Sequence, residues 1–350
     1  MKISYMLKRE DFYAINKQTL HSFYTPEPGK ETTLYIYPHL NAIITRVPSK
    51  KVKQYIYTEY SIKASLPKRL LVWFYARLCL NSLGILAARK IKLPAQVPSH
   101  TLIYPCNRKF RIFDFGQNTV SVITKAGFPQ NSIQNEISFR TQCAPSDFIL
   151  PINTHTSNTY SERIIDGTPL ARLEDNAEEI KQTALQMWQA YSANHQKIVT
   201  APQYADLLQT EIDSLMEEIR NCKPSAHIAS ASRVVTKYLD VLRNTTNDIT
   251  LTQSHGDLQA GNIWVEKQTK QIYIIDWESV AQRSIWYDRA VLNNDIRKPH
   301  CFEAFAKSND ILNIVVILEE IIYRIQELCQ LPSDYGVDDF NIFINKLENF

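Results

Sequence analysis

The sequence predicts an α+β protein with two lobes, a small β-rich lobe followed by a larger and mainly helical lobe. Three short runs between residues 101 and 127, TLIYP, KFRIFDF and TVSVITKAG, are rich in β-branched and aromatic residues and are separated by polar turns. A helical pattern begins near Leu170 with segments such as AEEIKQTALQMWQAYSANHQ. The apolar segment DILNIVVILEEIIYRIQELCQ, near the end of the chain, predicts a buried helix in the second lobe.

These patterns divide the chain into three parts. Residues 1–95 form a basic N-terminal extension, in which TTLYIYPHLNAIITRV predicts a β-hairpin and the apolar segment 66–91 predicts a helix. Residues 96–168 form the small lobe, which includes a short helix at about 132–142, and residues 169–350 form the helical lobe. The Pro-containing segment KLPAQVPSH links the extension to the small lobe.

Composition indicates an ordinary globular protein. With 350 residues, 44% hydrophobic and 21% charged, the chain is long enough to bury a full core. The six cysteines are scattered without a C-x-x-C pair, which argues against a disulfide framework or a zinc ribbon. Because the N-terminus also lacks the apolar core of a signal peptide, we expect a cytoplasmic protein.

The net charge of +3 conceals a strong asymmetry. Residues 1–130 carry 20 Lys and Arg against 6 Asp and Glu, whereas the remaining 220 residues carry 19 against 30. Two explanations stand at this point. The basic residues of the first 130 positions form a surface that complements the acidic half of the same chain, or they bind an anionic partner such as a membrane surface. No nucleic-acid-binding motif accompanies the charge, so we expect no nucleic-acid partner.

The stretch LLVWFYARLCLNSLGILAA, residues 70–88, has the apolar character of a membrane segment. Arg77 and Asn81 lie near its middle, and an Arg at the centre of a membrane helix costs roughly 2.5–3.5 kcal/mol on insertion scales. We therefore expect a buried or interfacial helix and not a transmembrane span. Its basic surroundings predict a peripheral contact with an anionic membrane, on the inner face.

The densest group of polar side chains lies in SHGDLQAGNIWVEKQTKQIYIIDWES, residues 254–279. A polar loop precedes the strand-like IWVE, KQTKQ makes a turn, and IYIIDWE is a second apolar run that ends in acids. This unit would bring Asp257, Asn262 and Asp276 to one edge. Oxygen-bearing side chains of this kind are the ligands that Mg²⁺ prefers, usually together with substrate phosphates.

Residues 255–262 fit H-x-D-x-x-x-x-N, and HGDLxxxN…IIDWE resembles the aminoglycoside phosphotransferase and choline kinase branch of the protein-kinase-like enzymes. Tyr287-Asp288-Arg289-Ala290 is similar to an element that braces the catalytic loop in this branch. The resemblance covers residues 100–300 and implies a bilobal protein-kinase-like fold that uses ATP and Mg²⁺. It implies that Asp257 orients the acceptor hydroxyl or accepts its proton.

The resemblance also implies the ligands of the metal and of the nucleotide. Asn262 and Asp276 would hold Mg²⁺, with support from Glu278, while His255 would fix the loop by hydrogen bonding. In the small lobe, Lys125 would contact the α- and β-phosphates and Glu136 would position it. Taken alone, a lysine at a strand end is usually a solvated cation, but its position ahead of the Asp257 motif favours the kinase role. The segment YSERIIDGTPL resembles the hinge between lobes, where backbone groups from Glu162 to Ile164 would meet adenine; its Asp-Gly pair also fits an ordinary turn.

The sequence departs from the kinase pattern in one respect. Neither G-x-G-x-x-G nor a Walker A motif is present. The turn from Cys106 to Lys109 is a candidate for covering the phosphates, with Arg108 or Lys109 supplying positive charge. An ordinary hairpin turn explains the same residues.

The leading hypothesis is an ATP- and Mg²⁺-dependent phosphotransferase that acts on a hydroxyl of a small molecule or glycan. A cell-envelope sugar or a lipid-linked precursor would suit the basic extension. Two alternatives remain: a catalytically idle kinase fold that binds nucleotide, and an antibiotic kinase of the aminoglycoside type. A protein kinase is disfavoured because the chain has no D-F-G, no A-P-E and no recognisable activation segment.

Overall fold

The computed structural model describes residues 13–61, 66–308, 310–331 and 336–349. The chain forms two compact units. The first contains residues up to Ile137 together with Leu150–Asp166, and the second contains Ser138–Ile149 and Gly167–Phe350. The first unit is built on a large antiparallel sheet and the second is mainly helical, so the predicted α+β fold class is confirmed.

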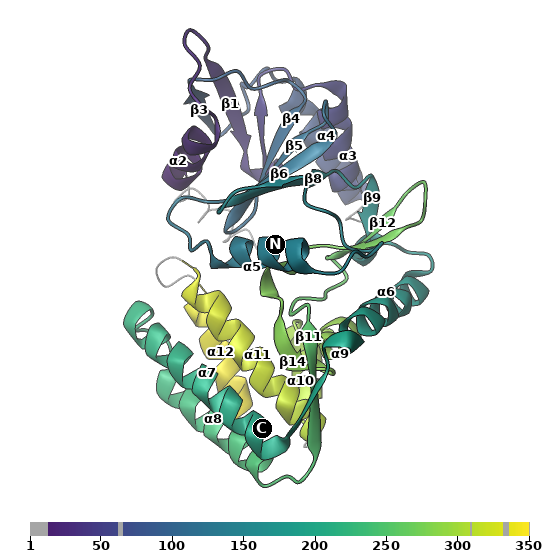
Figure 1. Ribbon diagram of the computed structural model, residues 1–350. Helices are drawn as coiled ribbons and strands as arrows, with labels where there is room; N and C mark the ends of the chain where they lie inside the picture. The colour runs from purple at the N-terminus through teal and green to yellow at the C-terminus, as the bar shows by residue number, and fades with distance from the viewer. Residues whose placement is uncertain (1–12, 62–65, 309, 332–335, 350) are drawn as a thin grey trace. The chain divides into compact units, whose positions relative to one another are not determined.

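In the described part of the first unit, eight strands form one antiparallel sheet in the order β3-β1-β2-β4-β5-β6-β8-β7 (Figure 1). Three of these strands come from the basic extension, and Ile43 of β2 pairs with Ile103 of β4. The sheet therefore reaches beyond the segment 96–168 that the sequence assigns to the small lobe. The strands are β1 (Thr32–Tyr37), β2 (Ala42–Thr45), β3 (Arg89–Leu93), β4 (Thr101–Pro105), β5 (Lys109–Asp114), β6 (Thr119–Thr124), β7 (Thr154–His155) and β8 (Thr159–Arg163).

Both faces of this sheet are covered by helices. Alternate residues of a strand point to opposite faces, and in β1 Leu34 joins one apolar cluster while Tyr35 joins the other. The Leu34 face packs against α2 (Tyr13–Phe23), and the Tyr35 face packs against α3 (Lys50–Ser61) and α4 (Leu66–Asn81). This double burial explains why β1 and β2 carry apolar residues on both sides.

The helix predicted over residues 66–91 is shorter in the structure. It ends at Asn81, because Leu83 and Gly84 adopt positive φ angles of 52° and 86° that a helix cannot accommodate. A Cβ on Gly84 would lie 2.0 Å from the ring of Tyr35, so the turn depends on glycine. None of the helices in the described ranges combines the length and the apolar character that crossing a bilayer requires.

Most helices of the second unit pack around α11, whose residues from Ile314 to Leu318 are all buried. Helix α6 instead contributes Ala184, Leu185 and Trp188 to a separate apolar cluster. Two small sheets accompany these helices, in the orders β10-β11-β14 and β13-β12-β9. Among the described residues, the helices are α6 (Ala177–Ser192), α7 (Ala201–Cys222), α8 (Ile228–Arg243), α9 (Tyr287–Asn293), α10 (Pro299–Ala306), α11 (Ile311–Cys329) and α12 (Val337–Glu348); α5 (Asn131–Gln142) spans both units. The strands are β9 (Gly167–Pro169), β10 (Lys197–Thr200), β11 (Asp248–Ser254), β12 (Ile263–Glu266), β13 (Ile272–Ile274) and β14 (Ala281–Ser284).

One buried carboxylate joins three elements of this core. Glu319 of α11 accepts hydrogen bonds from the hydroxyl of Tyr204 on α7 and from both the backbone N–H and the hydroxyl of Ser284 on β14. Burial raises the pKa of Glu319 to about 7, and these hydrogen bonds oppose the rise. The folded protein therefore holds a proton on Glu319 in a pH range where the unfolded chain has released it.

Stability should fall as pH rises because of this carboxyl. Its pKa is raised from 4.5 to about 7, so its contribution is complete below pH 4.5 and is lost between pH 4.5 and 7. The loss amounts to at most about 3 kcal/mol of the free energy of unfolding. Urea unfolding at pH 5 and pH 8 should show this fall, and Glu319→Gln should reduce it. The exposed Glu217→Gln is the control, and an equal fall in all three proteins would refute the assignment.

Candidate active site

The loop of residues 255–262, here called the Asp257 loop, connects β11 to β12 in the second unit. Its far end is fixed to the hairpin that follows, because the backbone N–H of Ile275 donates to the carbonyl of Asn262 (2.9 Å). Ile263 then pairs with Ile274 across β12 and β13. Asp276 follows this pairing directly, so the hairpin places Asn262 and Asp276 at the same end of the small sheet.

The carboxylate of Asp257 is held from several sides. The amide nitrogen of Asn262 donates to Asp257 Oδ2 (3.1 Å) and to its backbone carbonyl (2.8 Å), and Gln259 donates to Oδ1 (2.6 Å). Arg297 lies 3.5 Å from Oδ1. Burial raises the pKa of Asp257 to about 6; Arg297 and Gln259 oppose the rise, while the nearby charges of Asp276 and Glu278 add to it.

Asp276 and Glu278 flank the first residue of a 3₁₀ turn, Trp277–Ser279. Asp276 has φ 73° and ψ 55°, a left-handed conformation that is uncommon for any residue except glycine and that clusters at functional sites. Both acids lie close enough to Asp257 for their charges to act on it. The structure therefore brings together the four residues that the sequence singles out in this unit: Asp257, Asn262, Asp276 and Glu278.

The donor set of this region fits Mg²⁺ better than a soft metal. Within the described ranges, no three His, Cys, Asp or Glu side chains cluster as metal ligands. Asn262 commits its amide nitrogen to Asp257, which leaves its amide oxygen available for a cation. One amide oxygen and one or two carboxylates form a partial oxygen set, of the kind that Mg²⁺ completes with water and substrate phosphates.

Asp288, the first acid of α9, braces the near end of the Asp257 loop. Its Oδ2 accepts from the backbone N–H of His255 (2.8 Å), and its Oδ1 accepts from the hydroxyl of Ser254 (2.9 Å) and the N–H of Gly256 (3.0 Å). The indole of Trp188 donates a fourth bond, of 2.7 Å. Hydrogen bonds to an ionised acceptor are the stronger kind, so four of them hold the loop firmly.

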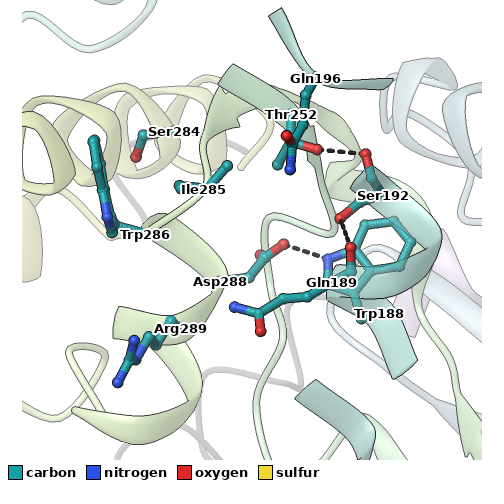
Figure 2. A pocket seen from close by; sticks show the side chains of 10 residues that line it. All are labelled: Trp188, Gln189, Ser192, Gln196, Thr252, Ser284, Ile285, Trp286, Asp288 and Arg289. Atoms are coloured by element: carbon teal, nitrogen blue, oxygen red, sulfur yellow. Dashed lines mark hydrogen bonds between the residues drawn. The ribbon is translucent and has the colours of Figure 1, made fainter. Parts of the chain in front are cut away.

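A cavity of about 310 Å³ adjoins Asp288 on this side. Figure 2 shows the bond from Trp188 to Asp288 and the bond from Thr252 to the carbonyl of Ser192 in its lining. Gln189, Gln196 and Arg289 add polar groups to the lining of the cavity. The cavity thus lies beside the group that positions the Asp257 loop.

His255 is fully buried and makes two hydrogen bonds that define its role. The backbone N–H of Asp257 donates to Nδ1 (3.2 Å), so Nε2 carries the proton and donates to the carbonyl of Ile275 (3.2 Å). Burial lowers the pKa of His255 below its usual value, which favours this neutral form. With both nitrogens engaged, the imidazole ties the loop to the β13 end and is not placed to act as a base.

Arg297 is a functional candidate that sequence reasoning missed. Its guanidinium donates to the carbonyl of Gly256 (2.8 Å) and to the hydroxyl of Tyr287 (2.9 Å), in addition to its contact with Asp257. Its Nε lies 3.1 Å from the fully buried carboxylate of Glu320. In the sequence Arg297 is a single arginine in NDIRKPH, forty residues after Asp257, and no spacing rule connects the two.

The first unit gathers the residues that the sequence assigns to the nucleotide. The backbone N–H of Lys125 donates to the carbonyl of Arg108 (2.8 Å), and its ammonium donates to the carbonyl of Cys106 (2.5 Å). Lys125 therefore contacts the candidate phosphate-covering turn directly. Tyr160 donates to the buried carboxylate of Glu136 (2.9 Å), and the ammonium of Lys109 lies 3.9 Å from the same carboxylate. Lys109 is thus a buried lysine beside Glu136, the carboxylate to which the sequence assigns Lys125.

The predicted hinge residues lie at the end of this unit. Glu162 belongs to β8 and pairs with Val120 of β6, and the N–H of Ile164 donates to the carbonyl of Asn118 (3.1 Å). The boundary between the two units follows at Asp166, within the segment YSERIIDGTPL. The chain also passes between the two units after Ile137 and after Ile149, so this boundary is one of three.

No model of a known protein family matches the sequence, and no curated protein matches it either. Solved structures do match. A thermostable mutant of aminoglycoside phosphotransferase APH(4)-Ia, in its apo form, has a TM-score of 0.50 at 12% identity, with 71% of this chain and 92% of that chain covered. The chain has the protein-kinase-like fold.

Three further solved structures match at lower scores. Plasmodium vivax ethanolamine kinase has a TM-score of 0.43 at 11% identity, with coverage of 86% of this chain and 95% of that chain. A choline/ethanolamine kinase family protein from Mesorhizobium loti has a TM-score of 0.42 at 12% identity, with coverage of 79% and 92%. A ternary complex of APH(4)-Ia with ADP and hygromycin B has a TM-score of 0.48 at 12% identity, with coverage of 73% and 90%.

Gly256 should not tolerate a side chain. It has φ 82°, and a Cβ there would lie 2.2 Å from the carbonyl oxygen of Ser279 and 2.6 Å from Arg283. We expect Gly256→Ala to lower the free energy of unfolding by roughly 2 kcal/mol or more, measured by urea denaturation. Gly261→Ala is the matched control, because nothing lies within 4 Å of a Cβ at that position. Equal stability of the two variants would contradict the close packing of the loop.

Proposed function

We propose that the protein is an ATP- and Mg²⁺-dependent phosphotransferase that acts on a hydroxyl group of a small molecule or glycan. The observation that carries this proposal is the arrangement around Asp257. Its carboxylate is fixed by Asn262, Gln259 and Arg297 in a loop that Asp288 braces, with Asp276 nearby. A carboxylate positioned next to a partial Mg²⁺ ligand set is the arrangement that phosphoryl transfer requires.

Each residue has a defined task in this reaction. Asp257 would accept a hydrogen bond from the acceptor hydroxyl, orient its oxygen toward the γ-phosphorus, and take its proton as the oxygen–phosphorus bond forms. The bond between the γ-phosphorus and the β–γ bridging oxygen would break in the same transfer, with ADP as the leaving group. Asn262 and Asp276, supported by Glu278, would hold Mg²⁺, which supplies positive charge to the phosphate oxygens when it is bound. Arg297 would keep Asp257 in place through its contacts with the carboxylate and with the backbone of Gly256.

In the first unit, Lys125 and the turn that carries Arg108 would bind the phosphates of ATP. Glu136 lies buried close to Lys109, and we assign it the task of organising the positive charge in this region. The backbone from Glu162 to Ile164 would meet the adenine ring. Cations and backbone amides of the turn would replace the glycine-rich loop that the sequence lacks.

The acceptor that we favour is a cell-envelope sugar or a lipid-linked precursor, phosphorylated in the cytoplasm at the inner face of the membrane. The basic extension supports this choice, because its positive charge suits an anionic surface. An antibiotic kinase of the aminoglycoside type would bind a cation and would use the acidic second half of the chain instead. A panel that contains both acceptor classes distinguishes the two.

Asp257→Asn should lower the rate of phosphoryl transfer by roughly 100-fold or more, because a positioned general base contributes that much. The measurement is ADP release from ATP and Mg²⁺ with a panel of hydroxyl acceptors, together with ATP binding by calorimetry. Asp213→Asn, on the exposed side of α7, is the matched control and should have no effect. Undiminished turnover by Asp257→Asn would refute the assignment. ATP binding without ADP release for every acceptor would favour the idle kinase fold.

Lys125→Met should weaken ATP binding by roughly 10-fold or more, because a hydrogen bond to a charged group contributes about 1.5–3 kcal/mol. The dissociation constant for ATP measures this effect, and a melting curve shows whether the variant still folds. Lys237→Met changes an exposed lysine of α8 and serves as the control. Unchanged affinity in a folded Lys125→Met variant would remove Lys125 from the nucleotide site.

A further inference from the structure

The outward face of α4 and the turn that follows it expose an unusual number of large apolar side chains. Of the thirteen such side chains in the described residues, eight lie between residues 70 and 86. Leu71 is 71% exposed and Ile85 is 83% exposed. The eight are Leu70, Leu71, Trp73, Phe74, Leu78, Leu83, Ile85 and Leu86, and we call them the α4 surface.

The opposite side of α4 is buried in the core of the first unit. Ala76, Cys79 and Leu80 are buried in the core cluster that α3, α4 and the sheet share. The α4 surface is therefore not a core face that has been left uncovered by poor packing. Because α4 is apolar on both sides, only one of its two faces can be explained by the interior of the first unit.

The spacing of the exposed residues produces a continuous ridge. Leu70, Phe74 and Leu78 follow each other at intervals of four residues, and such residues lie one above the other on a helix. Leu71 is seven residues before Leu78 and lies on the same side. Leu83, Ile85 and Leu86 continue the exposed apolar character beyond the helix end. Contiguous apolar surface of this kind marks an interaction site.

Cationic side chains border this ridge. The guanidinium of Arg77 lies 5.0 Å from the ring of Trp73, and Lys53 of α3 donates to Asn81 at the end of α4 (2.7 Å). On the edge strand β3, Lys90 is exposed, and its ammonium lies 5.4 Å from the ring of Tyr35, on the face of the sheet that packs against α4. Arg and Trp are the side chains that favour the boundary between lipid headgroups and acyl chains.

The charge selects among the partners that could cover such a surface. A second copy of the chain would place the same surface against itself in a two-fold dimer, so the cations of both copies would face each other. An anionic bilayer offers an apolar interior for the ridge and negative headgroups for its cationic border. A single partner of this kind would contact both the apolar ridge and its cationic border.

We propose that the α4 surface docks onto a bilayer that contains anionic lipids, with Phe74 and Leu71 inserted below the headgroups. This inference gives a location to the peripheral membrane contact in the proposed function, and it concerns lipid binding alone. The helix would lie in the plane of the membrane interface, with its buried face still attached to the first unit. An acceptor carried by a lipid would then be collected at the surface where it resides.

The test is flotation of the full-length protein with vesicles of phosphatidylcholine containing 30% phosphatidylglycerol, and with pure phosphatidylcholine. We expect binding to the anionic vesicles that weakens as salt is raised. The double variant Leu71→Asn, Phe74→Asn should reduce the bound fraction by roughly tenfold or more, because two large apolar side chains no longer enter the lipid. Trp73 should show a blue-shifted emission on binding, which Trp73→Phe removes.

The control double variant, Ile198→Asn with Leu207→Asn, changes two exposed apolar residues elsewhere and should bind vesicles as the wild type does. No flotation of the wild type at low salt, or equal flotation of the α4 variant, would overturn the proposal. So would a lipid-free dimer that the α4 variant abolishes. ATP binding of the same variants, measured without lipid, should stay unchanged, so a failure of the membrane surface is separate from a failure of the phosphotransferase.

Discussion

The geometry of the candidate site depends on the carboxylate of Asp288, which accepts four hydrogen bonds. Three of its donors belong to consecutive residues, Ser254, His255 and Gly256, at the point where β11 ends and the Asp257 loop begins. A buried donor of this kind that is left without a partner costs about 1–3 kcal/mol. One side chain of α9 thus sets the direction in which the loop leaves the sheet, and the glycine at position 256 allows the sharp turn.

In the second unit, some of the groups around Asp257 favour its charged form and others disfavour it. Burial and the neighbouring acids disfavour its charge, whereas Arg297 and Gln259 favour it. Arg297 is itself held by the buried carboxylate of Glu320, which also pairs with Arg324 (2.7 Å) and accepts from the hydroxyl of Tyr287 (2.9 Å). The reactive carboxylate is therefore fixed in place by a chain of buried interactions that reaches into α11.

The first unit shows how one sheet can serve two purposes. Its β4–β6 strands carry the turn and the lysine that we assign to the nucleotide, and its β1–β3 strands extend it toward α3 and α4. The basic character of the extension is thus displayed on a rigid scaffold, because strands and helices of this segment share one core. A charged, apolar surface on a folded scaffold is better suited to docking than the same residues on a free tail.

The sequence by itself determined the reaction class that we propose and the local elements that carry it. The motif from His255 to Asn262, the acid at position 276 and the alternating strands all depend on spacing along the chain, which is visible without a structure. The roles of Arg297, Glu320 and Asp288 were decided by the tertiary structure, because these residues lie 31 to 63 positions away from Asp257. The four hydrogen bonds of Asp288 likewise join residues that are 32 to 100 positions apart. The same holds for the extension. Its hairpin follows from the local pattern, but the pairing of β2 with β4, which makes the extension part of the lobe, is a contact across sixty residues that no local pattern encodes.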